Sequence, residues 1–339
     1  MLHIRNFLYI LSVIVLLFSI NVAYSGEEVN LYSARKEHLI RPIIDLFEKR
    51  THIKVNIVTA KAAQLHQRIL SEGKNSPADV LLTTDAGNLW KAEKANFFQV
   101  IHSTILNNKI DKKYRDLDNK WWGLSLRARI IVYNKNTVKK NELQGYKYLS
   151  DPIFKSRILI RSSGNIYNQS LIAHMIEKYG ENITEHWAAG LKENFARQPA
   201  GGDRDQIKAV AAGEADIAIV NSYYFAKLIN SEEKDSFKHL QVHFPVDKKM
   251  GVHLNISGAG VMVNAPNPEN ATRFIEFLTS DEAQEIYSYV NYEYPVVASV
   301  GIPETLKNWG ILYPDDISTT VYGKHGKLAI KIADRVGWN

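Results

Sequence analysis

The chain has 339 residues, of which 45% are hydrophobic and 23% are charged, and it contains no cysteine. This composition excludes an intrinsically disordered chain, and the lack of cysteine excludes a disulfide framework and a lipid anchor attached through a thiol. The formal net charge is +6 with basic and acidic residues interspersed, so the sequence offers no basic run of the kind that binds nucleic acid.

The first 25 residues differ from the rest of the chain. Arg5 is followed by the almost unbroken apolar run Phe7–Val22, and Ala23-Tyr24-Ser25 places small residues at the positions that a signal peptidase reads. A membrane anchor is the alternative, but the apolar run is shorter than the roughly 20 residues that a spanning helix needs. Residues 1–25 are therefore predicted to be a cleaved signal peptide, which makes the mature protein periplasmic.

The next region alternates short β-type runs with helical patterns. Apolar residues recur at helical spacing between Leu39 and Phe47, and Ala78–Leu82 is a continuous apolar run of the kind found in buried parallel strands. The expected strands are Val29–Tyr32, Ile53–Val58 and Ala78–Leu82, and the expected helices include Ala62–Ser71 and Asp85–Ala95. Such alternation is typical of an α/β lobe with a parallel sheet.

The same pattern then restarts and predicts a second α/β lobe. Strands are expected at Leu126–Tyr133, Arg157–Arg161 and Ala215–Val220, with helices at Asn168–Tyr179, Thr184–Phe195 and Asp203–Ala212. A strand at Gly251–Asn264 is expected to return to the first lobe, followed by helices at Pro268–Leu278, Asp281–Val290 and Lys327–Val336. We assign residues 26–126 plus 253–300 to the N-terminal lobe and residues 127–252 plus 301–339 to the C-terminal lobe.

Tyrosines follow the predicted strands at several places. Tyr32, Tyr167 and the adjacent pair Tyr223-Tyr224 all lie where a strand ends. Ligands of open α/β sheets bind beyond the carboxyl ends of strands, so these side chains are candidates for a cleft between the lobes. The alternative is that tyrosines end strands because their rings are apolar and their hydroxyls are wet.

Several phenols together favour one kind of ligand. A phenol has a pKa of about 10, but a highly charged, oxygen-loving cation can displace its proton. Ferric iron suits phenolate oxygen, whereas calcium favours carboxylates and zinc favours histidine and cysteine. Arg127 and Arg129 share one face of a strand, where they could balance a phenolate or hold a carbonate-like anion on the metal. Ion pairs between the lobes or at the surface are the alternative for both.

At these residues the chain resembles the periplasmic ferric-iron-binding proteins of iron(III) ABC transporters. The resemblance implies a class II, two-lobed periplasmic-binding fold that closes like a hinge on Fe3+, with Tyr223 and Tyr224 as its tyrosine pair. Subgroups with more tyrosine ligands match Tyr32 and Tyr167, while Leu31 stands where many members carry a histidine. The segments that carry the likeness are LYSAR (Leu31–Arg35), PADVLLTTDAGNLW (Pro77–Trp90), WGLSLRARIIVYN (Trp122–Asn134), GEADIAIVNSYY (Gly213–Tyr224) and GVHLNISGAGV (Gly251–Val261).

The predicted function is capture of Fe3+ and its delivery to an inner-membrane ABC permease, with the binding protein acting as a monomer. The alternatives are a binding protein of the same fold for an iron chelate, phosphate, thiamine, a polyamine or a sugar, or a transferase enzyme. No nucleophile elbow, phosphate loop, zinc motif or dinucleotide fingerprint is present in the sequence, which disfavours an enzyme.

Overall fold

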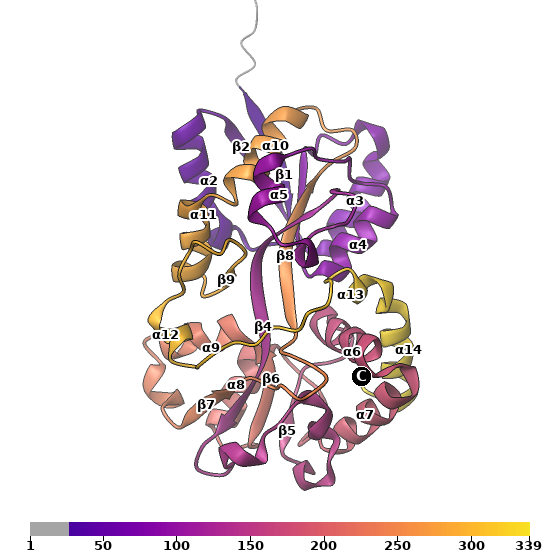
Figure 1. The fold of residues 1–339 in the computed structure, drawn as a ribbon, viewed down its shortest axis with the longest axis vertical. Coiled ribbons are helices and arrows are strands. Elements are labelled where there is room, and N and C mark those ends of the chain that lie inside the picture. The colour runs from indigo at the N-terminus through magenta and orange to yellow at the C-terminus, as the bar shows by residue number, and fades with distance from the viewer. Residues whose placement is uncertain (1–26) are drawn as a thin grey trace, which may run out of the picture.

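The computed structural model describes residues 27–339, so the predicted signal peptide at 1–25 lies outside the described residues. Figure 1 shows two α/β halves, one above the other, joined by the long strands β4 (Trp122–Asn134) and β8 (Leu254–Val261). This arrangement agrees with the predicted two-lobed α/β fold. Within residues 27–339, no helix combines the length and the apolar character that crossing a bilayer would require.

The upper half contains a mixed sheet in the order β2-β1-β3-β8-β4. Strands β1 (Glu28–Ser33), β2 (Lys54–Thr59) and β3 (Val80–Thr84) are parallel, whereas β8 runs antiparallel to β3, and the short β9 (Tyr294–Pro295) pairs with β4. The helices of this half are α2 (Glu37–Thr51), α3 (Ala62–Glu72), α4 (Ala86–Lys94), α5 (Thr104–Lys109), α10 (Pro268–Phe277) and α11 (Asp281–Glu285), which continues as a π-helix at Ile286–Val290.

The lower half is built on the end of β4, which pairs with β6 (Ile217–Asn221) and β7 (Leu240–His243), while β5 (Ile158–Leu159) lies parallel to β6. Its helices pack around this second sheet (Figure 1). They are α6 (Ile166–Tyr179), α7 (Glu181–Glu193), α8 (Asp203–Ala211) and α9 (Ser222–Ile229), with the C-terminal helices α12 (Glu304–Lys307), α13 (Val321–Lys324) and α14 (Gly326–Val336).

Strand β4 serves both sheets because it changes partners midway. It pairs with β8 as far as Ala128, and from Arg129 onward it pairs with β6. Nearly all of its residues are buried, as expected for a strand covered on both faces. The partner change falls between Ala128 and Arg129, and the division into lobes at 126/127 and 252/253 stays a proposal.

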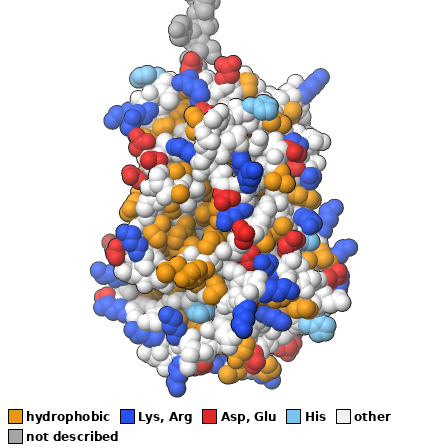
Figure 2. Space-filling view, in the orientation of Figure 1, with side chains coloured by type: hydrophobic (Ala, Val, Ile, Leu, Met, Phe, Trp, Pro, Cys, Tyr) orange, Lys and Arg blue, Asp and Glu red, His pale blue; other side chains and the backbone are white. Residues whose placement is uncertain are grey.

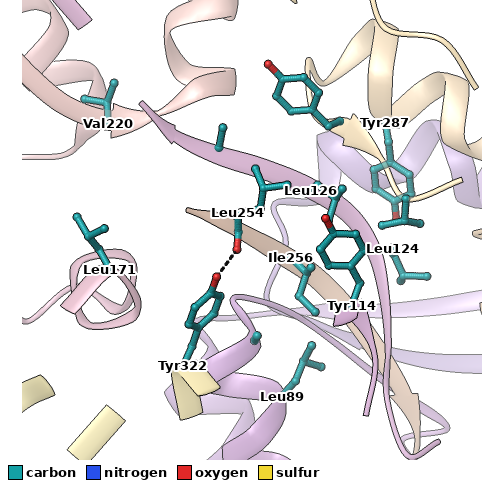
Figure 3. Close-up of a cluster of buried hydrophobic side chains, with 14 of the residues drawn as sticks. Leu89, Tyr114, Leu124, Leu126, Leu171, Val220, Leu254, Ile256, Tyr287 and Tyr322 are labelled. Atoms are coloured by element: carbon teal, nitrogen blue, oxygen red, sulfur yellow. Dashed lines mark hydrogen bonds between the residues drawn. The ribbon is translucent and has the colours of Figure 1, made fainter. Parts of the chain in front are cut away.

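The hydrophobic core continues from one half to the other around β4 and β8. Figure 3 shows Leu124 and Leu126 of β4 beside Ile256 of β8, with Leu89 of α4 on one side. The hydroxyl of Tyr322, on α13, donates a hydrogen bond of 2.7 Å to the carbonyl oxygen of Leu254. The C-terminal helices therefore pack onto the connecting strands, and they brace the junction between the halves.

The surface carries charges of both signs. Figure 2 shows lysine and arginine side chains among aspartate and glutamate side chains over the displayed face, in agreement with their interspersed order in the sequence. Several exposed pairs are one helical turn apart, such as Arg41 with Glu37, whose N–O distance is 2.7 Å. Such exposed pairs contribute little to stability, so the fold depends on the buried strands and the helix faces that cover them.

Candidate metal centre

Three of the four predicted ligand tyrosines lie in the first turns of helices. Tyr167 is the second residue of α6, whose start is capped by Asn165: its side-chain oxygen accepts a hydrogen bond of 3.0 Å from the Tyr167 backbone N–H. Tyr223 and Tyr224 are the second and third residues of α9, and their ring centroids are 4.1 Å apart. The positive end of a helix dipole favours negative charge, so both helix starts stabilise a phenolate.

The three phenols form one electrostatic group. Burial raises the pKa of Tyr223 well above 10, and the neighbouring phenols of Tyr167 and Tyr224 raise it further, whereas Arg127 opposes this shift. Burial also raises the pKa of Tyr224, with the Tyr167 phenol as the next cause. The phenols of Tyr223 and Tyr224 are therefore neutral at pH 7 without a ligand, and a cation that binds them must displace protons.

Arginines surround the tyrosine group. The guanidinium carbons of Arg127 and Arg161 lie 5.4 and 5.5 Å from the ring centroid of Tyr167. The guanidinium carbon of Arg204 lies 5.8 Å from the ring centroid of Tyr224. These positive charges attract electron-rich rings, and they attract phenolates more strongly still.

A second set of polar groups reaches the tyrosines from the upper half. Arg35, just beyond β1, forms a buried ion pair with Glu293 at 2.6 Å. Burial lowers the pKa of Arg35, but the carboxylate of Glu293 and the nearby phenols of Tyr287 and Tyr223 more than offset this effect. Arg35 and Arg127 both donate to the hydroxyl of Ser257, over 3.3 and 2.9 Å, so two guanidinium groups converge beside Tyr223.

The structure does not bring Tyr32 into this group, which corrects the prediction that all four tyrosines lie together. The Tyr32 hydroxyl donates a hydrogen bond of 2.8 Å to Glu72 of α3, and Arg68 of the same helix lies over its ring. Burial and this carboxylate raise the pKa of Tyr32 to about 12. Successive side chains of a strand point to opposite faces of the sheet, and the hydrogen bond to Glu72 shows that Tyr32 points to the face that α3 covers.

Arg129 also has a different place from the one predicted. Its guanidinium group forms a fully buried ion pair with Asp203 at 2.7 Å and donates to Asn168 and Asn221. Arg127 and Arg129 are separated because β4 changes partners between the two residues. Arg127 faces the tyrosines, whereas Arg129 forms an ion pair buried within the lower half, which is neither the predicted place nor the alternative of a pair between the lobes or at the surface.

Sequence reasoning missed several groups around the tyrosines. Arg35 follows the first strand directly, so its position in the chain was a usable signal. Glu293, Arg161 and Arg204 had no comparable signal, because their side chains meet the tyrosines only through tertiary folding.

The donor set suits a hard, highly charged cation. Within residues 27–339, no group of three or more His, Cys, Asp or Glu side chains is arranged to hold a metal ion. The candidate donor set consists of the phenols of Tyr167, Tyr223 and Tyr224, which lie near one another at two helix starts. The hydroxyl of Ser170, on α6, donates to Asp85 at the start of α4 over 2.7 Å, so the two halves are in contact beside this set.

The chain is similar to known proteins in both sequence and structure. Residues 75–310 match the family model described as "Bacterial extracellular solute-binding protein". Iron uptake protein A1 of Synechocystis sp. is 44% identical over 315 residues, which cover 92% of this chain and 88% of that protein. The Fe(3+)-binding periplasmic protein of Serratia marcescens is 27% identical over 287 residues, covering 84% of this chain and 83% of that protein.

A solved structure of similar shape comes from Trichodesmium and is described as IdiA (FutA) in complex with iron and citrate ligands. It has 49% sequence identity and a TM-score of 0.88, and the match covers 92% of this chain and all of that chain. The match is therefore long enough to include both halves.

Proposed function

The chain belongs to the bacterial extracellular solute-binding protein family, and on that premise we propose that it captures ferric iron between its two lobes for uptake by an ABC transporter. The family membership confirms the resemblance seen in the sequence, and it confirms a solute-binding protein in preference to an enzyme. The similar proteins from Synechocystis, Serratia and Trichodesmium are all described in terms of iron.

One observation carries the proposal: three phenols lie near one another at two helix starts, with arginines beside the rings of Tyr167 and Tyr224. Tyr167, Tyr223 and Tyr224 supply the metal ligands, and three phenolates balance the charge of Fe3+. The nearby arginines and the helix dipoles stabilise the phenolates, which offsets the burial that otherwise favours neutral phenols. Tyr32 is not included, because its hydroxyl is occupied by Glu72 on another face of the sheet.

Three oxygen ligands leave room for an anion on the metal. Arg127 and Arg35 converge on Ser257 beside Tyr223, and the Nε–H of each guanidinium group has no hydrogen-bond partner among the described residues. A carbonate or a carboxylate could satisfy such donors in a bidentate manner. We therefore assign the anion to Arg127 with Arg35 in place of the predicted pair Arg127 and Arg129.

The transport cycle follows from the two-lobed fold. The lower lobe provides the tyrosines and binds the ion first, and closure then brings Arg35 and Glu293 of the upper lobe over it. Closure removes water and strengthens each electrostatic contact around the metal. In this proposal residues 1–25 direct export to the periplasm, and the closed monomer docks on an inner-membrane permease that receives the iron.

The direct test is metal loading of the purified mature chain. Fe3+ bound by phenolates gives a visible charge-transfer band and a red to orange colour, which a site without phenolate ligands lacks. The double variant Tyr223→Phe with Tyr224→Phe is expected to lose the band together with most of the affinity. Tyr32→Phe is the matched control and is expected to keep both. Full iron binding in the double variant would refute the site.

An iron chelate is the second candidate ligand, because the similar Trichodesmium structure holds citrate with iron and Arg35 and Arg127 offer partners for a carboxylate. Titrations with iron supplied as citrate and as a weak, exchangeable complex separate the two cases. If the bare ion is the ligand, the protein takes up iron without citrate. If the chelate is the ligand, radiolabelled citrate stays bound in a fixed ratio to iron.

A further inference from the structure

A groove away from the tyrosines lies between the helices of the upper half and the C-terminal helix. It has a volume of about 520 Å³, and Figure 1 shows α3 and α4 on one side of the upper sheet with α13 and α14 just below them. None of Arg35, Arg127 and the three ligand tyrosines borders it. Its lining consists of Ala62, Ala63, His66, Gln67, Leu81, Thr83, Asn88, Trp90, Lys91, Ala92, Lys94, Ala95 and Lys327.

The charge in this groove is of one sign. Three lysines line it and no aspartate or glutamate does. Among the described residues, only Lys94 has a carboxylate within ion-pair distance, namely Glu93 at 2.8 Å, whereas Lys91 and Lys327 have none. Burial lowers the pKa of His66, and the positive charge of Lys91 lowers it further, so His66 is neutral at pH 7. The groove therefore attracts an anion.

The rest of the lining is apolar and aromatic. Gly323 of α13 packs closely against the side chain of Trp90. A Cβ atom added at Gly323 would lie only 2.2 Å from the indole ring. The Nζ atom of Lys94 lies 5.6 Å from the centroid of this ring, and Leu81 and the small side chains of Ala62 and Ala63 line the same groove. A flat apolar body stacks well on a rigid indole, since aromatic faces offer large contact areas at low entropic cost.

One buried polar group in the lining also lacks a partner. Thr83 lies on β3, on the same face of the sheet as Leu81, and it is only 2% exposed. Its hydroxyl has no hydrogen-bond partner among the described residues. A buried hydroxyl without a hydrogen-bond partner destabilises the protein, and a hydrogen bond to a ligand oxygen would remove this cost. Rotation about χ1 can turn the hydroxyl toward the ligand.

From these features we propose that the groove between α3, α4 and α14 binds a small organic anion, with a flat apolar body against Trp90 and a carboxylate near Lys91 and Lys327. The two lysines come from different parts of the fold, α4 and α14, so one carboxylate between them joins the upper half to the C-terminal helix. This site is separate from the proposed iron site and does not depend on it.

The test is a titration of the iron-free mature chain with 2-naphthoate, followed by calorimetry. Saturable binding to one site is expected, and it should weaken as salt is added. Lys91→Gln and Lys327→Gln are each expected to weaken binding about tenfold. Thr83→Val should weaken binding without destabilising the fold, because the hydroxyl has no partner to lose. Lys331→Gln, another exposed lysine on α14, is the matched control.

Two further titrations test where the anion binds and whether its charge is needed. The neutral analogue 2-naphthylmethanol should bind much more weakly, since it keeps the rings and loses the charge. The double variant Tyr223→Phe with Tyr224→Phe should bind 2-naphthoate as the unmodified chain does. Absence of saturable binding would overturn the proposal, and so would binding that the lysine variants leave unchanged.

Discussion

At the scale of single residues, the environment of a side chain decides whether it can serve the metal. Tyr223 and Tyr32 are both buried, and burial is the main cause of their raised pKa values. An arginine opposes the shift in both cases, Arg127 at Tyr223 and Arg68 at Tyr32, but only Tyr32 donates a hydrogen bond to a carboxylate, that of Glu72. A carboxylate hydrogen-bonded to a phenol holds its proton, so the environment of Tyr223 is the one that suits a phenolate ligand.

This difference explains which site residues the sequence could predict. Tyr167, Tyr223 and Tyr224 follow their strands in the chain, and the helices that begin there direct them to one point. Tyr32 lies inside β1, and its partner could not be predicted, because Glu72 comes from α3 and meets the hydroxyl only through tertiary folding. Partners such as Glu293 come from distant segments, and a single sequence contains no signal for them.

The buried pair of Arg129 and Asp203 gives a prediction about stability. Arg129→Met should destabilise the protein by about 3 kcal/mol, because Asp203 stays buried and then keeps only its 3.3 Å contact with Arg161 and a hydrogen bond of 2.7 Å from the backbone N–H of Asn221. Guanidinium chloride unfolding measures the change. Adding Asp203→Asn to the variant should restore part of the loss, since the uncompensated charge is then gone. If Arg129→Met unfolds as the unmodified chain does, the pair has no structural role.

At the scale of secondary structure, the strands and helices could largely be predicted from periodicity. The expected helix at Ala62–Ser71 is observed at Ala62–Glu72, and the expected strand at Ala215–Val220 is observed at Ile217–Asn221. Helix α9 was missed because its first turn, with two tyrosines, was interpreted as a turn after the strand. The partner change in β4 could not be predicted, because it depends on which strands of each sheet reach it.

The close packing of β8 against β4 gives a second prediction. A Cβ atom at Gly258 would lie 2.5 Å from the carbonyl oxygen of Trp122 and 2.7 Å from a methyl group of Leu89. Since a paired backbone cannot move aside, Gly258→Ala should cost about 1–3 kcal/mol of unfolding free energy. Gly326→Ala is the matched control, because no atom lies within 4 Å of its Cβ position. Thermal unfolding distinguishes them, and equal melting temperatures would contradict this packing.

At the scale of the whole molecule, the fold places a phenol-rich lower lobe against an arginine and a carboxylate of the upper lobe. The crossing strands join the two lobes, and Ser257 on β8 accepts hydrogen bonds from the guanidinium groups of Arg35 and Arg127. The two-lobed fold could be predicted from the alternation of strands and helices. How the lobes meet could not, because Arg35 and Glu293 are 258 residues apart in the chain.

The pH dependence of iron binding follows from this arrangement. The pKa values of Tyr223 and Tyr224 are raised in the iron-free protein, so both phenols are protonated at pH 7. Binding as phenolates releases these protons, and the apparent affinity must therefore fall as the pH falls. We expect about three protons released per iron if all three tyrosines bind, measured in weak buffer. Tyr224→Phe should release about one fewer, and an unchanged count would exclude Tyr224 as a phenolate ligand.

The most direct measurement is a crystal structure of the iron-loaded mature chain with anomalous diffraction recorded at the iron absorption edge. The expected result is a single strong anomalous peak within bonding distance of the hydroxyl oxygens of Tyr167, Tyr223 and Tyr224, with Tyr32 still on Glu72. An iron peak elsewhere in the molecule, or a peak whose ligands include none of these three oxygens, would contradict the account.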